Sequence, residues 1–177
     1  MAGWSEAITE IFRFFNNLIS GARSHIRKVV NIYDSMHKIL DETQVERFII
    51  FKAHNGGGFI RPNTPLYVSA IYEDYTHPFH SVKDSLQKLE VDEGYLRMLA
   101  SINTKNKVII TTATLEKGFL KDLYESEGVK YAEIYYLGQD RKSLYFCSAA
   151  SSFIWEDNSY NRAALNLGIT KIRNNIK

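Results

Sequence analysis

An unbroken apolar run, Phe-Ile-Ile-Phe, covers residues 48–51. β-branched and aromatic residues dominate it, which is typical of a strand covered on both faces. Residues 54–58, His-Asn-Gly-Gly-Gly, end this strand, because consecutive glycines permit the positive φ angles of a tight turn. The sequence therefore predicts a central strand that leads into a glycine-rich loop.

Two stretches with helical spacing of apolar residues precede this strand. They cover residues 4–22 and 24–40, where apolar positions recur every three or four residues. Ser20 and Gly21 interrupt the pattern, and Ser24 is expected to cap the second helix. Two consecutive helices are therefore predicted at the start of the chain.

The segments after the glycine loop alternate between strand and helix patterns. Asp92 and Thr114 are expected to cap two helices, and Asn158 is expected to begin the last one. A turn at residues 138–141 joins the final two strands as a hairpin. The predicted strands of this part are 66–74, 108–112, 129–137 and 142–149. Strands joined by hairpins and helices in one sheet predict an α+β fold, with helices on both faces of the sheet.

Composition places the protein in an ordinary globular class. Its 177 residues are 45% hydrophobic, which suits one domain with an appendage and argues against general disorder. The formal net charge of +2 is too small to predict a nucleic-acid partner. The single cysteine, Cys147, excludes an intrachain disulfide and any multi-cysteine metal site.

Neither a secretory signal nor a membrane span is predicted. The start of the chain lacks a basic region and a small-residue cleavage site, and no apolar run approaches the roughly 18 residues of a span. The lone cysteine fits a reducing compartment. We therefore expect a cytoplasmic protein, with a virion as the alternative location.

The order of the elements resembles the GAF branch of the GAF/PAS-like sensory folds. The likeness covers residues 24–150 and is carried by RFIIFKAHN (47–55), VIITT (108–112), LKDLYESEGVKYAEIYYLG (120–138) and SLYFCSAAS (143–151). It implies a GAF-like, mostly antiparallel sheet of about five to six strands, with a ligand pocket on one face and the terminal helices on the other. The chain then divides into an amphipathic arm, residues 1–23, and a GAF-like domain, residues 24–177. The AHNGGG segment is similar to one in stand-alone domains of bacteria and their tailed phages.

The departures from the GAF pattern limit what the resemblance implies about ligands. The NKFDE-type constellation of members that bind cyclic nucleotides is absent from the sequence. Cys147 has no partner cysteines and falls within the last strand, where an attachment cysteine for a bilin is not expected. No GAF ligand is therefore carried over to this chain, and no cofactor is expected.

The glycine-rich loop is the candidate ligand site. Its backbone amides can converge on a phosphate or carboxylate, with Lys52 and Arg61 adding positive charge. No Gly-Lys-Ser/Thr follows, so the loop is not a nucleotide P-loop. The alternative is a tight turn that closes over the sheet edge without a ligand. The expected ligand-binding residues are Lys52, His54, Asn55, Gly56, Gly57, Gly58 and Arg61.

Three histidines form the candidate metal site. His77 and His80, three residues apart, can share a metal with His54 and Asp74. Pro78 opposes the regular helix that would align them, and exposed loop residues are the competing interpretation. We therefore expect no metal.

No catalytic constellation is predicted. Cys147 alternates with bulky apolar neighbours, which indicates a small buried hydrophobe and not a nucleophile. Glu73 and Asp74 point to opposite sides of their strand, so they are a poor acid–base pair. The chain is therefore not expected to be an enzyme.

The first helix carries the strongest interaction signal. Its apolar stripe is too extensive to be left in water, so we expect self-association or docking to a partner protein. A membrane surface is the competing partner, but Glu6 and Glu10 are unlike the lysine-rich polar face of interfacial helices. The expected interface residues are Trp4, Ile8, Ile11, Phe12, Phe15 and Ile19.

These observations predict a non-enzymatic GAF-like module that works by binding and assembly. The first alternative is a structural component of a phage virion or similar particle, in which the pocket is vestigial. The second is a metal-dependent enzyme that uses His54, His77 and His80. The sequence does not identify a small-molecule ligand.

Overall fold

The computed structural model describes residues 3–59, 64–156 and 158–176, with side chains of the first helix from residue 19 onward. Its helices are α1 (Gly3–Glu42), α2 (Glu93–Lys105), α3 (Phe119–Ser126) and α4 (Ser159–Asn175), with a 3-10 turn, η1 (Thr112–Thr114). Its strands are β1 (Arg47–His54), β2 (Tyr67–Tyr75), β3 (Leu89–Glu90), β4 (Lys107–Thr111), β5 (Tyr131–Gln139) and β6 (Ser143–Ser151). The described elements confirm the predicted α+β class.

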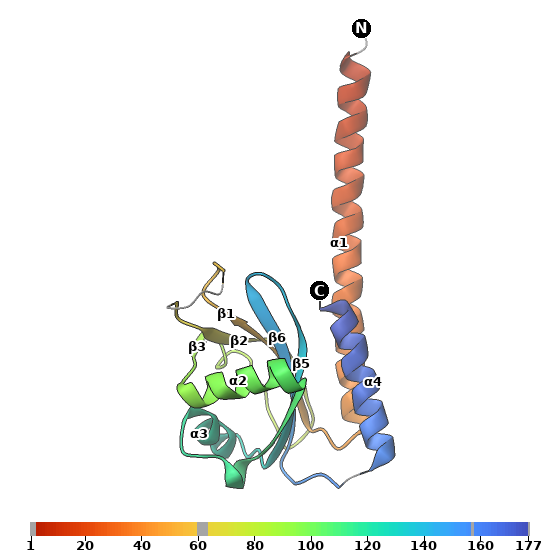
Figure 1. Cartoon of the computed structure of the whole chain (residues 1–177). Coiled ribbons are helices and arrows are strands. Elements are labelled where there is room, and N and C mark those ends of the chain that lie inside the picture. Colours follow the sequence, from red (N-terminus) through yellow and green to blue (C-terminus); the bar gives the residue numbers. More distant parts are fainter. Residues whose placement is uncertain (1–2, 60–63, 157, 177) are drawn as a thin grey trace.

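The strands form one antiparallel sheet in the order β3-β2-β1-β6-β5-β4. Helices α1 and α4 cover one face, and α2 and α3 cover the other (Figure 1). β1 pairs with β2 on one side and β6 on the other, so the predicted central strand is central. The hairpin between β5 and β6 is also confirmed.

Side chains of β1 enter two separate hydrophobic cores. Ile49 and Phe51 pack with residues of α2 and α3, whereas Phe48 and Ile50 pack with residues of α1 and α4. Alternation along a strand sends successive side chains to opposite faces. The unbroken apolar run is explained by this two-sided burial.

The two predicted N-terminal helices are one continuous helix, and this part of the sequence prediction was wrong. α1 passes through Ser20, Gly21 and Ser24 without a break. A single glycine inside a helix costs only about 1 kcal/mol, too little to end it. α1 extends well beyond the sheet at its N-terminal end, and α4 runs back along its C-terminal half (Figure 1).

Helices α1 and α4 pack closely where Gly168 meets Ile39. A Cβ atom on Gly168 would lie 2.5 Å from Cγ1 of Ile39, which is inside the contact distance of real side chains. Glycine therefore permits this close approach, and the C-terminal half of α1 belongs to the domain core.

One aspartate caps two helices. Asp92 Oδ1 accepts a hydrogen bond from the backbone N–H of Tyr95 in α2, at 2.8 Å. Asp92 Oδ2 accepts one from the N–H of Phe119, the first residue of α3, at 3.1 Å. The predicted start of this helix at Thr114 was wrong, because residues 112–114 form the 3-10 turn. The predicted caps Asp92 and Asn158 are confirmed.

Candidate functional site

The space between the sheet and helices α2 and α3 is where the GAF resemblance places a ligand pocket. Phe51 and Phe146 stack there with ring centroids 5.1 Å apart, and the ring of Tyr95 lies 6.5 Å from that of Phe146. The cavity that remains among these side chains is about 20 Å³. That volume suits one water molecule, so aromatic side chains fill the interior.

A buried arginine borders this small cavity. Arg47 is 4% exposed, its Nη1 donates to Oε2 of Glu127 at 3.1 Å, and its guanidinium lies 4.6 Å from the ring centroid of Phe79. Its Nε is buried without a hydrogen-bond partner among the described residues. The oxygens of Tyr124 and Ser148 line the same cavity, 3.5 Å apart.

Sequence analysis missed Arg47 because arginine at the start of a strand is usually exposed. The detectable signal was its position directly before the apolar run at residues 48–51.

His54, in the predicted loop site, is held by its neighbours. The backbone N–H of Gly56 donates to Nδ1 of His54 at 3.1 Å, so Nε2 carries the proton and donates to Oγ of Ser69 at 3.0 Å. Partial burial, together with the charges of Lys52 and Lys88, lowers the pKa of His54 below its usual 6.5. His54 is therefore a neutral structural residue of the loop near pH 7.

The glycine-rich loop is a tight turn that closes on itself. Gly56 and Gly57 have φ angles of 85° and 129°, so the predicted positive φ is confirmed at these two positions. Asn55 Nδ2 donates to the carbonyl of Phe59 within the same loop. Arg61 lies outside the described residues. Lys52 lies apart from the turn, in a groove beside α1. Anion binding by the loop stays a prediction.

The histidines of the metal hypothesis have different neighbours. His54 contacts Ser69, whereas Nε2 of His80 lies 4.0 Å from Oε2 of Glu127. Asp74 lies beside His37, with 3.6 Å between Oδ2 and Nδ1. Across the described part of the chain, no three His, Cys, Asp or Glu side chains form a group that could hold a metal ion.

Cys147 is fully buried, as predicted, and burial raises the pKa of its thiol.

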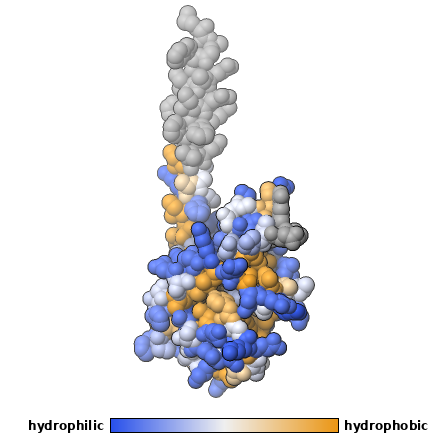
Figure 2. Space-filling model, turned by 90° about the vertical axis from the view of Figure 1, so that its left-hand side faces the viewer, coloured by the Kyte–Doolittle hydropathy of each residue, from blue (hydrophilic) through white to orange (hydrophobic). Residues whose placement is uncertain are grey.

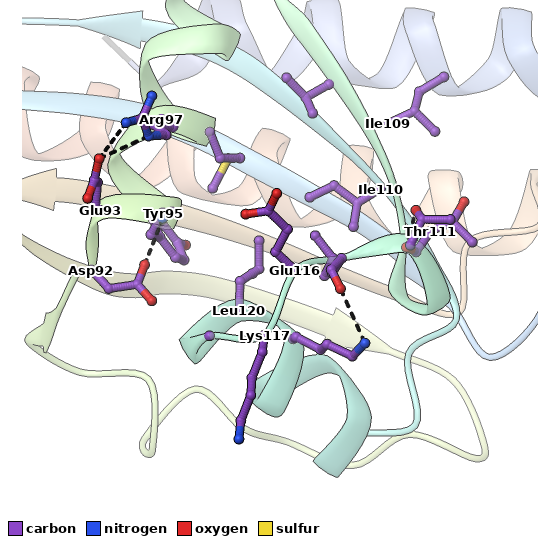
Figure 3. Close-up of a pocket in the computed structure, with 17 residues that line it drawn as sticks. Asp92, Glu93, Tyr95, Arg97, Ile109, Ile110, Thr111, Glu116, Lys117 and Leu120 are labelled. Atoms are coloured by element: carbon purple, nitrogen blue, oxygen red, sulfur yellow. Dashed lines mark hydrogen bonds and ion pairs between the residues drawn. The ribbon is translucent and has the colours of Figure 1, made fainter.

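A cleft of about 760 Å³ lies between α2, β4 and the segment that joins η1 to α3 (Figure 3). Three of its charged groups pair within the fold: Glu93 pairs with Arg97, and Lys121 Nζ donates to the carbonyl of Leu115 at 3.2 Å. Asp92 serves as the double helix cap described above. Paired charges of both signs make no catalytic constellation.

A buried carboxylate joins α4 to the sheet. Glu133 of β5 is 0% exposed, and the Tyr131 hydroxyl donates to its Oε1 at 2.8 Å. Tyr135 and Arg162 also donate to this carboxylate, and Lys107 Nζ lies 3.5 Å away. Burial alone would raise the pKa of Glu133, but these donors outweigh it and lower the pKa. The cluster anchors α4, and sequence analysis did not find it.

The predicted assembly residues lie on α1. The helix includes Trp4, Ile8, Ile11, Phe12 and Phe15, but their side chains lie outside the described part. The described stripe of exposed apolar residues consists of Ile19, Ile26, Val30 and Tyr33. Figure 2 shows apolar surface along α1 between the grey atoms and the body of the protein.

Comparisons with known proteins find similarity in structure but none in sequence. No protein-family model matches the sequence, and no curated protein matches it. The GAF domain of a two-component sensor histidine kinase from Bacillus halodurans is 12% identical, with a TM-score of 0.58 over 82% of this chain and 90% of that one. A far-red cyanobacteriochrome photoreceptor is 12% identical, with a TM-score of 0.52 over 93% and 94%.

The chromophore-binding domain of an unusual bacteriophytochrome from R. palustris is 10% identical, with a TM-score of 0.55 over 89% of this chain and 61% of that one. At such identities the likeness concerns the fold and carries no ligand to this chain. The arrangement of four helices and a six-stranded antiparallel sheet in the described residues is the GAF fold.

Proposed function

We propose that this chain is a non-enzymatic GAF-fold binding module that assembles with a second copy of itself through α1. The observation that supports this most directly is the exposed apolar stripe on a helix that extends beyond the domain. The similar solved structures include sensory and chromophore-binding domains, which favours a binding module over an enzyme at the level of the fold.

The spacing along α1 is that of a helix that pairs along a narrow seam. Ile19, Ile26 and Tyr33 are seven residues apart, and Val30 lies between the last two. The sequence continues the pattern toward the N-terminus at Phe15 and Phe12, at spacings of four and three. The successive spacings from residue 12 to residue 33 are three, four, seven, four and three, and a seven-residue apolar repeat is typical of coiled coils.

An unpaired helix of this kind is poorly stabilised in water. Most of the stability of a helix in a protein comes from packing of its apolar face. On α1, the residues from Ile32 onward have that packing, whereas Ile19, Ile26 and Val30 are exposed. A second copy would cover this stripe with an identical one, as symmetric dimers do.

The filled interior supports assembly over capture of a large ligand. The cavity among Phe51, Tyr95 and Phe146 is about 20 Å³, which has room for a water molecule and no cofactor. The cleft of about 760 Å³ lies at the edge of the sheet, beside β4. A structural role in a larger particle also fits a closed interior. Cytoplasm and virion both stay predictions for where the protein works.

The test is the mass in solution, measured by light scattering after size-exclusion chromatography. We expect a dimer for the full chain and a monomer for Ile26→Asp, because a charge in the seam opposes pairing. Ile154→Asp is the matched control, since Ile154 and Ile26 are 62% and 61% exposed and Ile154 lies in the loop before α4. A full chain that is monomeric at all concentrations, or equal masses for the two variants, would contradict the proposal.

Lipid is the competing partner for the stripe. No helix in the described residues is long and apolar enough to cross a bilayer. A helix that lies on the surface would still take the full chain to the top of a gradient with liposomes of anionic lipid. Flotation of the full chain, lost in Ile26→Asp, would replace the dimer with a membrane surface.

A further inference from the structure

A second cavity lies on the opposite side of the sheet from the expected GAF pocket. It has a volume of about 540 Å³ and is enclosed by α1, by the sheet and by the C-terminal end of α4. This volume is in the range of sites for small organic molecules. We call it the α1 groove.

Cationic and hydroxyl groups line the α1 groove. His25 and Lys28 come from α1, Lys52 from β1, and Tyr72 and Tyr145 from β2 and β6. No aspartate or glutamate is among the lining residues. The lining residues therefore include no carboxylate that could neutralise the Lys52 ammonium.

Two of these polar groups can donate hydrogen bonds to a ligand. Among the described residues, neither the Lys52 ammonium nor the Tyr72 hydroxyl makes a hydrogen bond or ion pair. Lys52 is half-buried and lies opposite Tyr145 in the sheet register. Asp140, whose Oδ2 accepts from the Tyr145 hydroxyl at 3.2 Å, interacts electrostatically with Lys52 from outside the groove lining. An ammonium held on a rigid strand is well placed to receive an anion.

Apolar side chains complete the walls of the groove. Val29 and Ile32 contribute from α1, Ile71 from β2 and Ile176 from the end of α4. Tyr33 packs edge-on against Tyr72, with ring centroids 5.5 Å apart, which holds that ring at the sheet surface. The groove thus combines an apolar floor with a small number of cations, as sites for amphipathic anions do.

The larger cleft beside β4 is lined by both acidic and basic side chains. Its lining includes Glu93 and Glu116 as well as Arg97, Lys117 and Lys121. There, the ion pair between Glu93 and Arg97 satisfies both groups without a ligand. The α1 groove is therefore the better candidate for a charged ligand.

We propose that the α1 groove binds a small organic anion, with a carboxylate or phosphate held by Lys52 and an apolar body lying on Ile71 and Val29. The anion also accepts a hydrogen bond from the Tyr72 hydroxyl. A carboxylic acid with an alkyl chain and an alkyl phosphate of the same chain length share this chemistry. The experiment therefore compares a carboxylate with a phosphate as the anionic group.

The test is calorimetric titration of the full chain with four probes: decanoate, decyl phosphate, decanol and inorganic phosphate. We expect decanoate or decyl phosphate to bind at least about tenfold more tightly than decanol or inorganic phosphate, because both halves of the ligand are needed. The tighter of the two anions identifies the group that the site prefers. Decanol bound as tightly as decanoate, or inorganic phosphate as tightly as decyl phosphate, would overturn the proposal.

Two lysine variants locate the site. Lys52→Gln should lower the affinity for the more tightly bound probe at least about tenfold, since the substitution removes one charge-assisted hydrogen bond. Lys117→Gln removes the same charge in the cleft on the other face of the sheet and should leave binding unchanged. Equal affinities for the two variants would place the binding elsewhere, and circular dichroism melts of both establish that they are folded.

The mass in solution distinguishes a ligand in the α1 groove from a second copy of the chain bound there. Lys52→Gln is expected to keep the mass of the full chain in light scattering, because Lys52 is on the sheet and not on the exposed stripe of α1. A change of mass in this variant, together with no binding of any probe, would assign the groove to a protein contact and overturn the ligand.

Discussion

At the scale of single residues, two helical glycines have opposite roles. In Gly168→Ala the new Cβ would lie 2.5 Å from Cγ1 of Ile39, which is buried, so we expect a loss of about 1–3 kcal/mol. In Gly21→Ala the new Cβ meets nothing within 4 Å, so we expect a gain of about 0.5–1 kcal/mol from helix propensity. Urea unfolding measures both, and a shift of the two variants in the same direction would contradict this account.

Glu133 is a buried carboxylate whose protonation is expected to affect stability. Burial opposes its charge, but the hydrogen bonds from Arg162, Tyr135 and Tyr131 dominate and hold its pKa below 4.5. Its contribution is therefore fully present above pH 4.5 and is lost as the pH falls through the lower folded pKa. Glu133→Gln should lose about 3 kcal/mol or more at pH 7 and show a flatter decline in acid.

Unfolding in urea at pH 7 and in acid measures this effect. Glu93→Gln is the control, since Glu93 forms an exposed ion pair with Arg97 and should change stability by less than about 1 kcal/mol. Parallel acid declines for wild type and Glu133→Gln would show that another group carries the pH dependence.

At the scale of elements, β1 depends on burial on both of its faces. Ile50 is fully buried among residues of α1 and α4. An unpaired charge there costs several kcal/mol, so Ile50→Asp should not fold. Ile154→Asp, in an exposed loop, should melt close to wild type. A thermal melt of Ile50→Asp within a few degrees of wild type would contradict the central position of β1.

The glycine-rich loop makes a conditional prediction. Gly57 has a φ of 129°, a conformation that valine cannot adopt without strain. Gly57→Val should therefore rearrange the loop and abolish any binding of phosphate there, while the sheet keeps its fold. A thermal-shift screen of the wild-type chain with phosphate and nucleotides comes first. If phosphate and nucleotides do not change the melting temperature, the loop is a turn without an anion-binding site.

At the scale of the whole molecule, we expect the domain to fold without the N-terminal part of α1. The described residues 19–22 are exposed, and burial on α1 begins further along the helix. Deleting residues 1–22 should therefore leave a folded chain whose melting temperature, measured at low concentration, changes by only a few degrees. A deletion variant that fails to fold would make the arm part of the domain and move the predicted boundary at residue 23.

The sequence anticipated the sheet better than the site. The strand at residues 48–51, the hairpin and the caps Asp92 and Asn158 are local patterns, and the structure confirms them. The glycine loop stays a predicted site, and sequence analysis did not find Arg47, Glu133 or the α1 groove. Each of these depends on side chains that are far apart in the chain, which periodicity does not reveal.

The sequence by itself determined the secondary structure wherever a few neighbouring residues decide it. Alternation of side chains, cap residues and turn glycines act over a few residues, so β1 and the positive φ of Gly56 and Gly57 follow from local composition.

Only the tertiary structure decided where α3 begins, because its cap, Asp92, is 27 residues from Phe119. The continuity of α1, by contrast, is a local property that the sequence pattern misjudged, because a weak break at Gly21 does not overcome helix propagation on either side. The closed interior and the cationic α1 groove arise from packing of several elements, whose combined contacts outweigh the preferences of any single segment.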